Sequence, residues 1–293
     1  MSGPPRKQMS PFRRTGSGLW LAILGVLLFA AGAGILLASP RHRALYYGEP
    51  PAVVAPAAGP SQVVAAVGSG KVPYPDALGR LRVRIADREP TRLPAEGAPP
   101  GWTLKEFAGH ASIELVRADG RLAARLRSER ASFAMHRDVV VELREFPYLS
   151  WTWKVTRLPA GGDVRDAARD DQAAQVYVIF PRWPSPRTKS DVVGYIWDSR
   201  APVGTRLKSP RADNVRIVVV ESGGARLNEW RAYERNVAAD YAALFGRQPP
   251  RVGKLAVMVD SNDTRGEAEA LFGDLVFART RQRSVEIPTP VLR

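Results

Sequence analysis

The chain has no cysteine and only three histidines among its 293 residues. Without cysteine there can be no disulfide, no thiolate nucleophile and no thiolate zinc site. His42 lies in a basic segment near the N-terminus, and the spacing of His110 and His136 suits no local metal motif. No Gly-x-Ser-x-Gly sequence occurs, so a serine hydrolase of that type is not supported.

Lysine is also scarce, because only seven of the 43 cationic residues are Lys and the rest are Arg. The net charge is +14, but the first 43 residues hold six cations and no acid, which leaves +8 for residues 44–293. Basic and acidic residues are mixed in that part, and no dense basic run alternates with aromatics. We therefore expect no nucleic-acid partner.

One long stretch has no charged side chain at all. Residues 19–38 are twenty consecutive apolar or small residues, which as a helix would span roughly 30 Å, the thickness of a bilayer core. The sequence therefore predicts a single transmembrane helix at residues 19–39. Because the span is long and Pro40 follows the nearest small-residue cleavage site, we interpret it as an uncleaved signal anchor; a cleaved secretory signal is the alternative.

The charges that flank this span predict its orientation. Four cations precede it and two follow it: Arg6, Lys7, Arg13 and Arg14, then Arg41 and Arg43. The positive-inside rule then places residues 1–18 as a cytoplasmic tail and the remainder outside. We expect a single-pass protein of a bacterial inner membrane, with its C-terminal domain in the periplasm.

The remaining chain divides by composition. Residues 40–75 are rich in Pro, Ala and Gly and predict an extended linker. Residues 76–280 contain short runs of β-branched and aromatic residues between turn signals, which predicts an all-β, jelly-roll-like β-sandwich. Residues 281–293 form a C-terminal tail. The strands we expect are Trp102–Phe107, Ala111–Val116, Leu122–Leu126, Phe133–Leu143, Leu149–Val155, Ala174–Phe180, Val193–Asp198, Val215–Glu221, Lys254–Asp260 and Asp274–Ala278.

Three local patterns refine this prediction. Asp119-Gly120 tolerates the positive φ of a tight hairpin turn. The alternation in Leu149–Val155 predicts that its Leu, Trp and Val side chains share one buried face. One short helix is expected from Asn236, which can cap it, to Phe245, with Gly246 ending it.

Acidic residues gather at the ends of two predicted strands. One loop carries Asp163, Asp166, Asp170 and Asp171, and a second run is Asp260-Ser261-Asn262-Asp263-Thr264. Such side chains commonly serve turns through their own backbone hydrogen bonds. Oxygen-rich loops also suit Ca²⁺, for which Asp260, Asn262 and Asp263 are the candidate ligands, although no cofactor is otherwise indicated. Paired carboxyl groups can also cleave a glycosidic bond.

Aromatic side chains suggest a second kind of contact. Trp183 lies in a proline-flanked loop and is the candidate for stacking on a sugar ring, whereas Trp151, Trp153 and Trp197 are expected in the core. Arg235 is predicted to pair with an acid of the Asp163–Asp171 loop. Whether that pair is structural or a ligand clamp is open.

The ordered series of motifs resembles a bacterial family, domain of unknown function 3047. The matching stretches are Leu149-Ser-Trp-Thr-Trp-Lys-Val155, Asp170-Asp-Gln-Ala-Ala-Gln-Val-Tyr-Val-Ile-Phe180, Gly194-Tyr-Ile-Trp197, Glu234-Arg-Asn236, Met258-Val-Asp-Ser-Asn-Asp-Thr264 and Gly273-Asp274. Gln175 and Gln172 depart from the pattern, which has Arg and an aromatic there. The resemblance implies the extent of the domain and no particular reaction. The last strand is similar to galactose-binding jelly rolls, an analogy of fold alone.

These observations predict an extracytoplasmic binding domain, with a carbohydrate or envelope polymer as its ligand. The candidate ligand-binding residues are Asp170, Asp171, Trp183, Arg235, Asn236, Asp260 and Asp263. A hydrolase or lyase that uses Asp170, Asp171, Asp260 or Asp263 as acid and base is the alternative. A scaffold for envelope proteins is a third, and it would require a broad apolar patch.

The topology can be tested directly. A phosphatase that folds only outside the cytoplasm, fused after Arg293, should be active, because the flanking charges place the C-terminus outside. A fluorescent protein that matures only in the cytoplasm is the matched control and should stay dark. The opposite pair of results would contradict the predicted orientation.

Overall fold

The computed structural model describes residues 73–182 and 190–281. The chain divides into two units, residues 1–64 and 65–293, and every described residue lies in the second. Among the described residues no helix has the length and apolarity to cross a membrane. The predicted span at residues 19–39 and the candidate Trp183 both lie outside the described residues.

Short strands dominate the described part of the chain, as the alternating sequence predicts. They are β1 (Arg80–Val83), β2 (Ala95–Glu96), β3 (Thr103–Ala108), β4 (Ser112–Ala118), β5 (Arg121–Glu129), β6 (Ser132–Val141), β7 (Tyr148–Arg157), β8 (Ala174–Phe180), β9 (Asp191–Asp198), β10 (Arg206–Lys208), β11 (Val215–Ser222), β12 (Arg231–Asn236), β13 (Val252–Asp260) and β14 (Glu267–Ala278). The helix α3 (Val237–Phe245) lies between β12 and β13.

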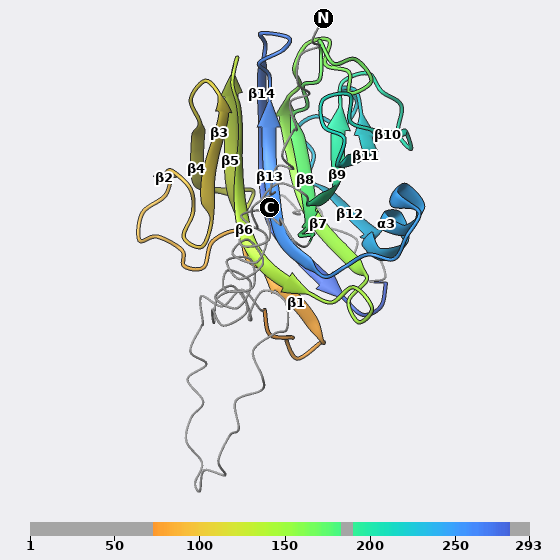
Figure 1. Cartoon of the computed structure of the whole chain (residues 1–293). Coiled ribbons are helices and arrows are strands. Elements are labelled where there is room, and N and C mark those ends of the chain that lie inside the picture. Colours follow the sequence, from red (N-terminus) through yellow and green to blue (C-terminus); the bar gives the residue numbers. More distant parts are fainter. Residues whose placement is uncertain (1–72, 183–189, 282–293) are drawn as a thin grey trace, which may run out of the picture. The chain divides into compact units, whose positions relative to one another are not determined.

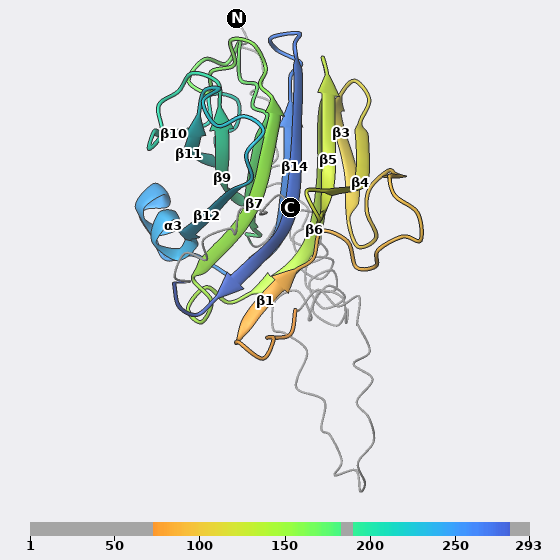
Figure 2. The same ribbon diagram turned by 180° about the vertical axis from the view of Figure 1, so that it is seen from behind.

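The strands form two seven-stranded sheets. Sheet A has the order β12-β7-β14-β5-β4-β2, with β1 also paired to β14, and sheet B has the order β10-β11-β9-β8-β13-β6-β3. Figures 1 and 2 show β7, β14 and β5 of sheet A side by side from two directions. Only β9 and β11 run parallel among the strand pairs described, and the others are antiparallel.

One hydrophobic core joins the two sheets. It contains Trp151 and Trp153 from sheet A together with Val176 and Trp197 from sheet B. In β7 the buried side chains alternate with partly exposed ones along the strand, as the alternation predicts. The all-β sandwich with one short helix and the core placement of the three tryptophans are therefore confirmed.

The hairpin turn is also as predicted, because Asp119 and Gly120 both have positive φ, at 50° and 76°, the requirement of a type I′ turn. The prediction misses four strands, β1, β2, β10 and β12, and places the start of the last strand wrongly. The last strand begins at Glu267 and not at Asp274, since Gly273 sits within a register shift that the pattern hides. The strand β12 was not predicted, because its charged residues give no apolar alternation.

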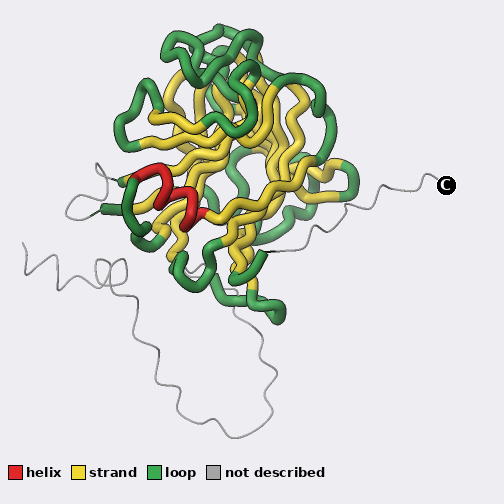
Figure 3. Tube along the Cα trace, turned by 90° about the vertical axis from the view of Figure 1, so that its right-hand side faces the viewer, coloured by secondary structure: helices red, strands yellow, loops and turns green. Residues whose placement is uncertain are grey.

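The helix α3 begins and ends as its sequence indicates. The side chain of Asn236 accepts a hydrogen bond from the backbone N–H of Ala239, and Gly246 takes the left-handed conformation at the other end. Figure 3 shows this helix as the one red segment beside the strands. The apolar face packs on the core through Val237 and Tyr241, with Leu244 and Phe245 partly buried.

Replacing the capping side chain tests whether Asn236 is mainly structural. Asn236→Ala should lower the free energy of unfolding by about 1 kcal/mol, because one amide of the first turn loses its acceptor. Asn236→Ser keeps an acceptor and serves as the matched control, with most of the stability retained. Chemical denaturation measures both. Equal stability of the two variants would contradict the capping role.

Candidate functional site

The alternation of two neighbouring strands sets up the site. Val176 of β8 and Val257 of β13 point into the core. The adjacent residue in each strand, Gln175 or Met258, therefore lies on the opposite face of sheet B, where the two are paired. We call this the outer face of sheet B. Asp260 ends β13 on the same face, two residues after Met258, and pairs across to Ser132 of β6.

A loop covers part of this face. Residues 158–173 join β7 to β8, and Val164 in that loop packs with Ile196 and Ile217 of sheet B in a small buried cluster. The buried Asp198 carboxylate fixes the loop further, since it accepts the Val164 N–H at 2.9 Å. Apolar packing and one buried acid therefore hold the acidic loop against the sheet.

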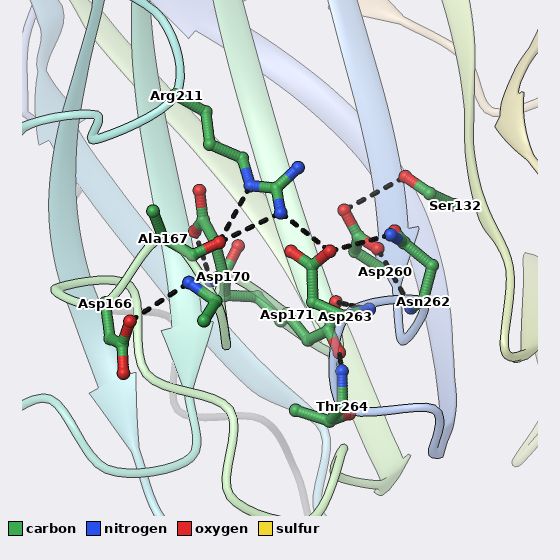
Figure 4. A network of polar contacts seen from close by, with 12 residues as sticks. Ser132, Asp166, Ala167, Asp170, Asp171, Arg211, Asp260, Asn262, Asp263 and Thr264 are labelled. Carbon is green, nitrogen blue, oxygen red and sulfur yellow. Dashed lines mark hydrogen bonds and ion pairs between the residues drawn. The ribbon is translucent and has the colours of Figure 1, made fainter.

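The second acidic run meets this loop. The Asp171 side chain is fully buried, and its two oxygens accept the backbone N–H groups of Asp263 and Thr264 at 3.1 and 2.6 Å. The Asp260 N–H donates to the carbonyl of Gln172 at 3.0 Å. Asp171 and Asp263 are 92 residues apart along the chain, and their contact brings the two acidic segments together at one end of the outer face (Figure 4).

Arg211 ties a third loop to the same point. Its guanidinium donates to the Asp263 carboxylate at 2.7 Å and to the Ala167 carbonyl through two nitrogens, at 3.0 and 2.9 Å. About half of the Arg211 side chain is exposed. In Figure 4 Arg211 reaches across from one side while Asp260 and Asn262 lie on the other side of Asp263. Nothing in the sequence pattern singles out Arg211, because Arg is abundant throughout the chain.

Two carboxyl groups in this cluster have unusual acidity. Burial raises the pKa of Asp260 to about 8, and the charge of Asp171 adds to the shift, although Ser132 donates a hydrogen bond at 2.9 Å that opposes it. Burial also raises the pKa of Asp170 to about 6, against the attraction of Arg211. At neutral pH Asp260 therefore holds its proton, while Asp170 is mostly ionised.

Tyr177 completes the site on the side of β9. Its hydroxyl donates to the Gln175 side chain. Burial and the charges of Asp170 and Asp260 raise the pKa of this hydroxyl well above its usual value. The ring lies against Gly194, where a Cβ atom would come within 2.5 Å of the ring carbon Cε1. Glycine at this position therefore gives the ring its place on the sheet.

The other predicted residues lie elsewhere. The prediction that Arg235 pairs with the Asp163–Asp171 loop is wrong: Arg235 pairs with Asp240 of α3 at 2.6 Å, because β12 lies beside β7 at the edge of sheet A. Asn236 caps the same helix. Asp163 is bound by Arg165 in its own loop.

The geometry does not fit a calcium ion. Within the described residues no group of three or more His, Asp or Glu side chains is arranged to hold a metal. The Oδ1 oxygen of Asp263 already accepts from Arg211 and from the Asn262 amide. Calcium requires several ionised or carbonyl oxygens free to turn toward it.

The domain matches a known protein family. The profile of the family described as "Protein of unknown function (DUF3047)" matches residues 100–276. The chain belongs to this family. The resemblance of the sequence motifs to that family is thereby confirmed. No curated protein matches the chain.

Several solved structures have a similar arrangement. The endoglucanase Cel12A from Rhodothermus marinus matches with a TM-score of 0.37 and 11% identity, over 63% of this chain and 99% of that one. The xyloglucanase domain of NopAA from Sinorhizobium fredii matches with 0.36 and 11%, over 64% and 96%. The glycoside hydrolase domain of Endo-D from Streptococcus pneumoniae matches with 0.34 and 11%, over 62% of this chain but only 22% of that one. Values this low say nothing about the ligand or reaction of the DUF3047 domain.

The acidity of Asp260 has a consequence for stability. When the pKa of a carboxyl group is higher in the folded than in the unfolded protein, the folded protein loses stability as the pH rises from the lower to the higher pKa. Asp260 should therefore contribute a fall in the free energy of unfolding from pH 4 to pH 8, and Asp170 a fall up to pH 6. Asp260→Asn should flatten this decline, as measured by denaturation at each pH.

Asp213→Asn is the matched control. Lys208 lowers the pKa of Asp213, so its protonation affects stability only below pH 4, and this variant should keep the wild-type decline. A wild-type slope in Asp260→Asn would contradict the protonated state of Asp260.

Proposed function

We propose that the chain is a membrane-anchored, extracytoplasmic domain that binds a carbohydrate at the polar end of the outer face of sheet B. The observation that carries the proposal is the convergence of three loops there, with Arg211 bridging Ala167 and Asp263 beside Asp170. Ligand sites typically combine a rigid scaffold with a few convergent polar groups. The ligand we favour is a glycan of the cell envelope.

Hydroxyl recognition fits the groups present. Neighbouring hydroxyls of a sugar both donate and accept, so they suit a surface that offers carboxylate oxygens next to guanidinium N–H groups. Asp170 and Asp263 supply the oxygens, and the half-exposed Arg211 supplies the donors. The bonds from Arg211 to Ala167 and Asp263 hold Arg211 and Asp263 in place, and the Gln172 amide donates to Asp170 at 2.9 Å. The three groups are thus ordered before a ligand arrives, which reduces the entropy lost on binding.

Other members of the cluster act through these groups. Asp171 is fully buried and is bonded to the Asp263–Thr264 backbone, so in this proposal it positions the turn. Asp260 is also largely buried, with 9% of its surface exposed. Trp183 remains the proposed stacking residue. Arg235 and Asn236, which contact α3, have no part in this site.

The location of the domain is part of the proposal. A membrane helix at residues 19–39 and the linker at 40–75 would hold the sandwich outside the cytoplasm, where envelope glycans are found. The flanking charges support that orientation.

Cleavage of a glycan by the same cluster is the second candidate. The observation in its favour is the division of acidity: Asp260 is protonated at neutral pH, Asp170 titrates near pH 6, and Asp263 is held in an ion pair with Arg211. General acid–base catalysis needs one carboxyl group that carries a proton and one that does not. Asp170 is the less buried of the two groups with raised pKa and would be the residue that contacts the substrate.

A binding experiment tests the first candidate. The full chain in non-ionic detergent should be retained on immobilised envelope polysaccharide. Arg211→Gln should weaken binding by roughly tenfold to a hundredfold, because a charged hydrogen bond contributes roughly 1.5–3 kcal/mol. Arg226→Gln, which removes a half-exposed arginine that pairs with Glu229, is the matched control and should bind as wild type. Absence of retention on a broad glycan panel would sink the proposal.

A variant of the same full chain distinguishes binding from cleavage. Asp170→Asn is nearly isosteric, so a cleaving enzyme with this variant should keep its ligand but release no new reducing or unsaturated ends. If wild type also releases none from glycans that it retains, the binding function stands and the second candidate is wrong.

A further inference from the structure

The helix α3 is surrounded by charges that the outer-face site does not use. Two aspartates belong to this group: Asp240 in the first turn of the helix, and Asp191 at the start of β9, which contacts Tyr241 of the helix. Both are buried, with 5% and 1% of their surface exposed. A buried carboxylate is strongly unfavourable unless cations and hydrogen-bond donors compensate it.

Arginines compensate Asp191. Its carboxylate accepts from Arg182 at 3.0 Å, from Arg247 and from the Tyr241 hydroxyl at 2.5 Å. Burial alone would raise the pKa of Asp191, but the three hydrogen bonds outweigh it and hold that pKa below its usual value. The acid therefore stays ionised and fixes two guanidinium groups from behind.

Asp240 is compensated in the same manner. Arg235 donates to both of its oxygens, at 2.9 and 2.6 Å, and the Tyr195 hydroxyl donates at 3.0 Å. Arg206 of β10 approaches the same carboxylate at 3.5 Å. Arg216 of β11 joins the group by lying over the Phe245 ring, 4.9 Å from its centre.

These contacts place an excess of positive charge around one helix. The arginine collar, as we name it, consists of Arg182, Arg206, Arg216, Arg235 and Arg247, against the two carboxylates of Asp191 and Asp240. Five cations and two anions leave a charge of +3. Nearby, Lys208 and Asp213 pair with each other and do not change this balance.

The collar is both rigid and accessible. The side chains of Arg182, Arg206 and Arg247 are 44%, 49% and 46% exposed. Arg182 and Arg247 are hydrogen-bonded to the buried Asp191, and Arg206 lies 3.5 Å from the buried Asp240. A guanidinium held in this way loses little further freedom when it binds an anion, and its planar fork matches a carboxylate.

We propose that the arginine collar binds an acidic polysaccharide through the carboxylates of its sugars. The positive charges are distributed around α3 at fixed positions, which suits a ligand whose anions also have a regular spacing. A membrane surface attracts flexible cationic side chains without fixed geometry, so it is the less suitable partner. The proposal concerns a surface beside α3 and does not depend on the outer-face site.

Binding of polygalacturonate to the full chain in non-ionic detergent tests the proposal, with uncharged dextran as the control ligand. Arg206→Gln combined with Arg216→Gln leaves Arg235 on Asp240 and both cations on Asp191, so the helix keeps its anchors. The affinity for polygalacturonate should fall about tenfold or more, and its dependence on salt should become shallower.

Two further variants make the result specific. Arg117→Gln with Arg130→Gln also removes two exposed cations, but away from α3, and should keep wild-type affinity. Arg206→Lys with Arg216→Lys preserves charge without the fork and should bind with intermediate affinity; it also serves if the Gln variant melts early.

Three outcomes would overturn the proposal. The first is an equal loss in the collar variant and in the Arg117 and Arg130 variant, which would mean attraction by net charge alone. The second is binding to polyphosphate but not to polygalacturonate. The third is binding to vesicles of anionic phospholipid with no binding to the polymer.

Discussion

The convergence of the acidic segments depends on one buried carboxylate. Asp171 accepts the N–H groups of Asp263 and Thr264 from a turn 92 residues away, and its side chain has no contact with solvent. If this acid were removed, two partly buried amides of the turn would lose their acceptors, which costs more than the net value of a hydrogen bond where water cannot replace the acceptor. This anchor holds the Asp263–Thr264 turn against the first loop, and strand β13 and the bond from the Asp260 N–H to Gln172 place Asp260 beside it.

Buried aspartates recur as anchors in a fold without disulfides, and their partners are of two kinds. Asp171 and Asp198 are compensated by backbone N–H groups, which carry no net charge. Asp191 and Asp240 are compensated by arginines that outnumber them. Of the first kind, Asp171 contributes its negative charge to the raised pKa of Asp260. The second kind leaves surplus positive charge around α3. The acidic outer-face site and the basic arginine collar therefore both arise from buried aspartates.

The sequence predicted the regular parts of the fold well. Strand β7 and helix α3 follow from patterns that one element contains by itself: alternating Leu, Trp and Val, and an Asn cap with a closing Gly. The partner of Arg235 could not be predicted in this way, because it depends on β12 lying beside β7. Arg211 had no signal either, since its role comes from three loops that meet only in the folded chain.

The density of aspartates in the first loop was a poor guide to chemistry for a related reason. Arg165 binds Asp163 from two residues away, and Arg169 binds Asp166 from three residues away. The hydrogen bonds from Arg165 lower the pKa of Asp163 to about 2. Asp170, in the same loop, accepts from the neutral amide of Gln172, so burial prevails and its pKa is about 6. Four acids that look alike in the sequence therefore differ in their surroundings. The hydrogen-bond partner of each is either near or far along the chain, and either charged or neutral. That distinction, more than the number of carboxylates, separates a turn residue from a candidate acid or base.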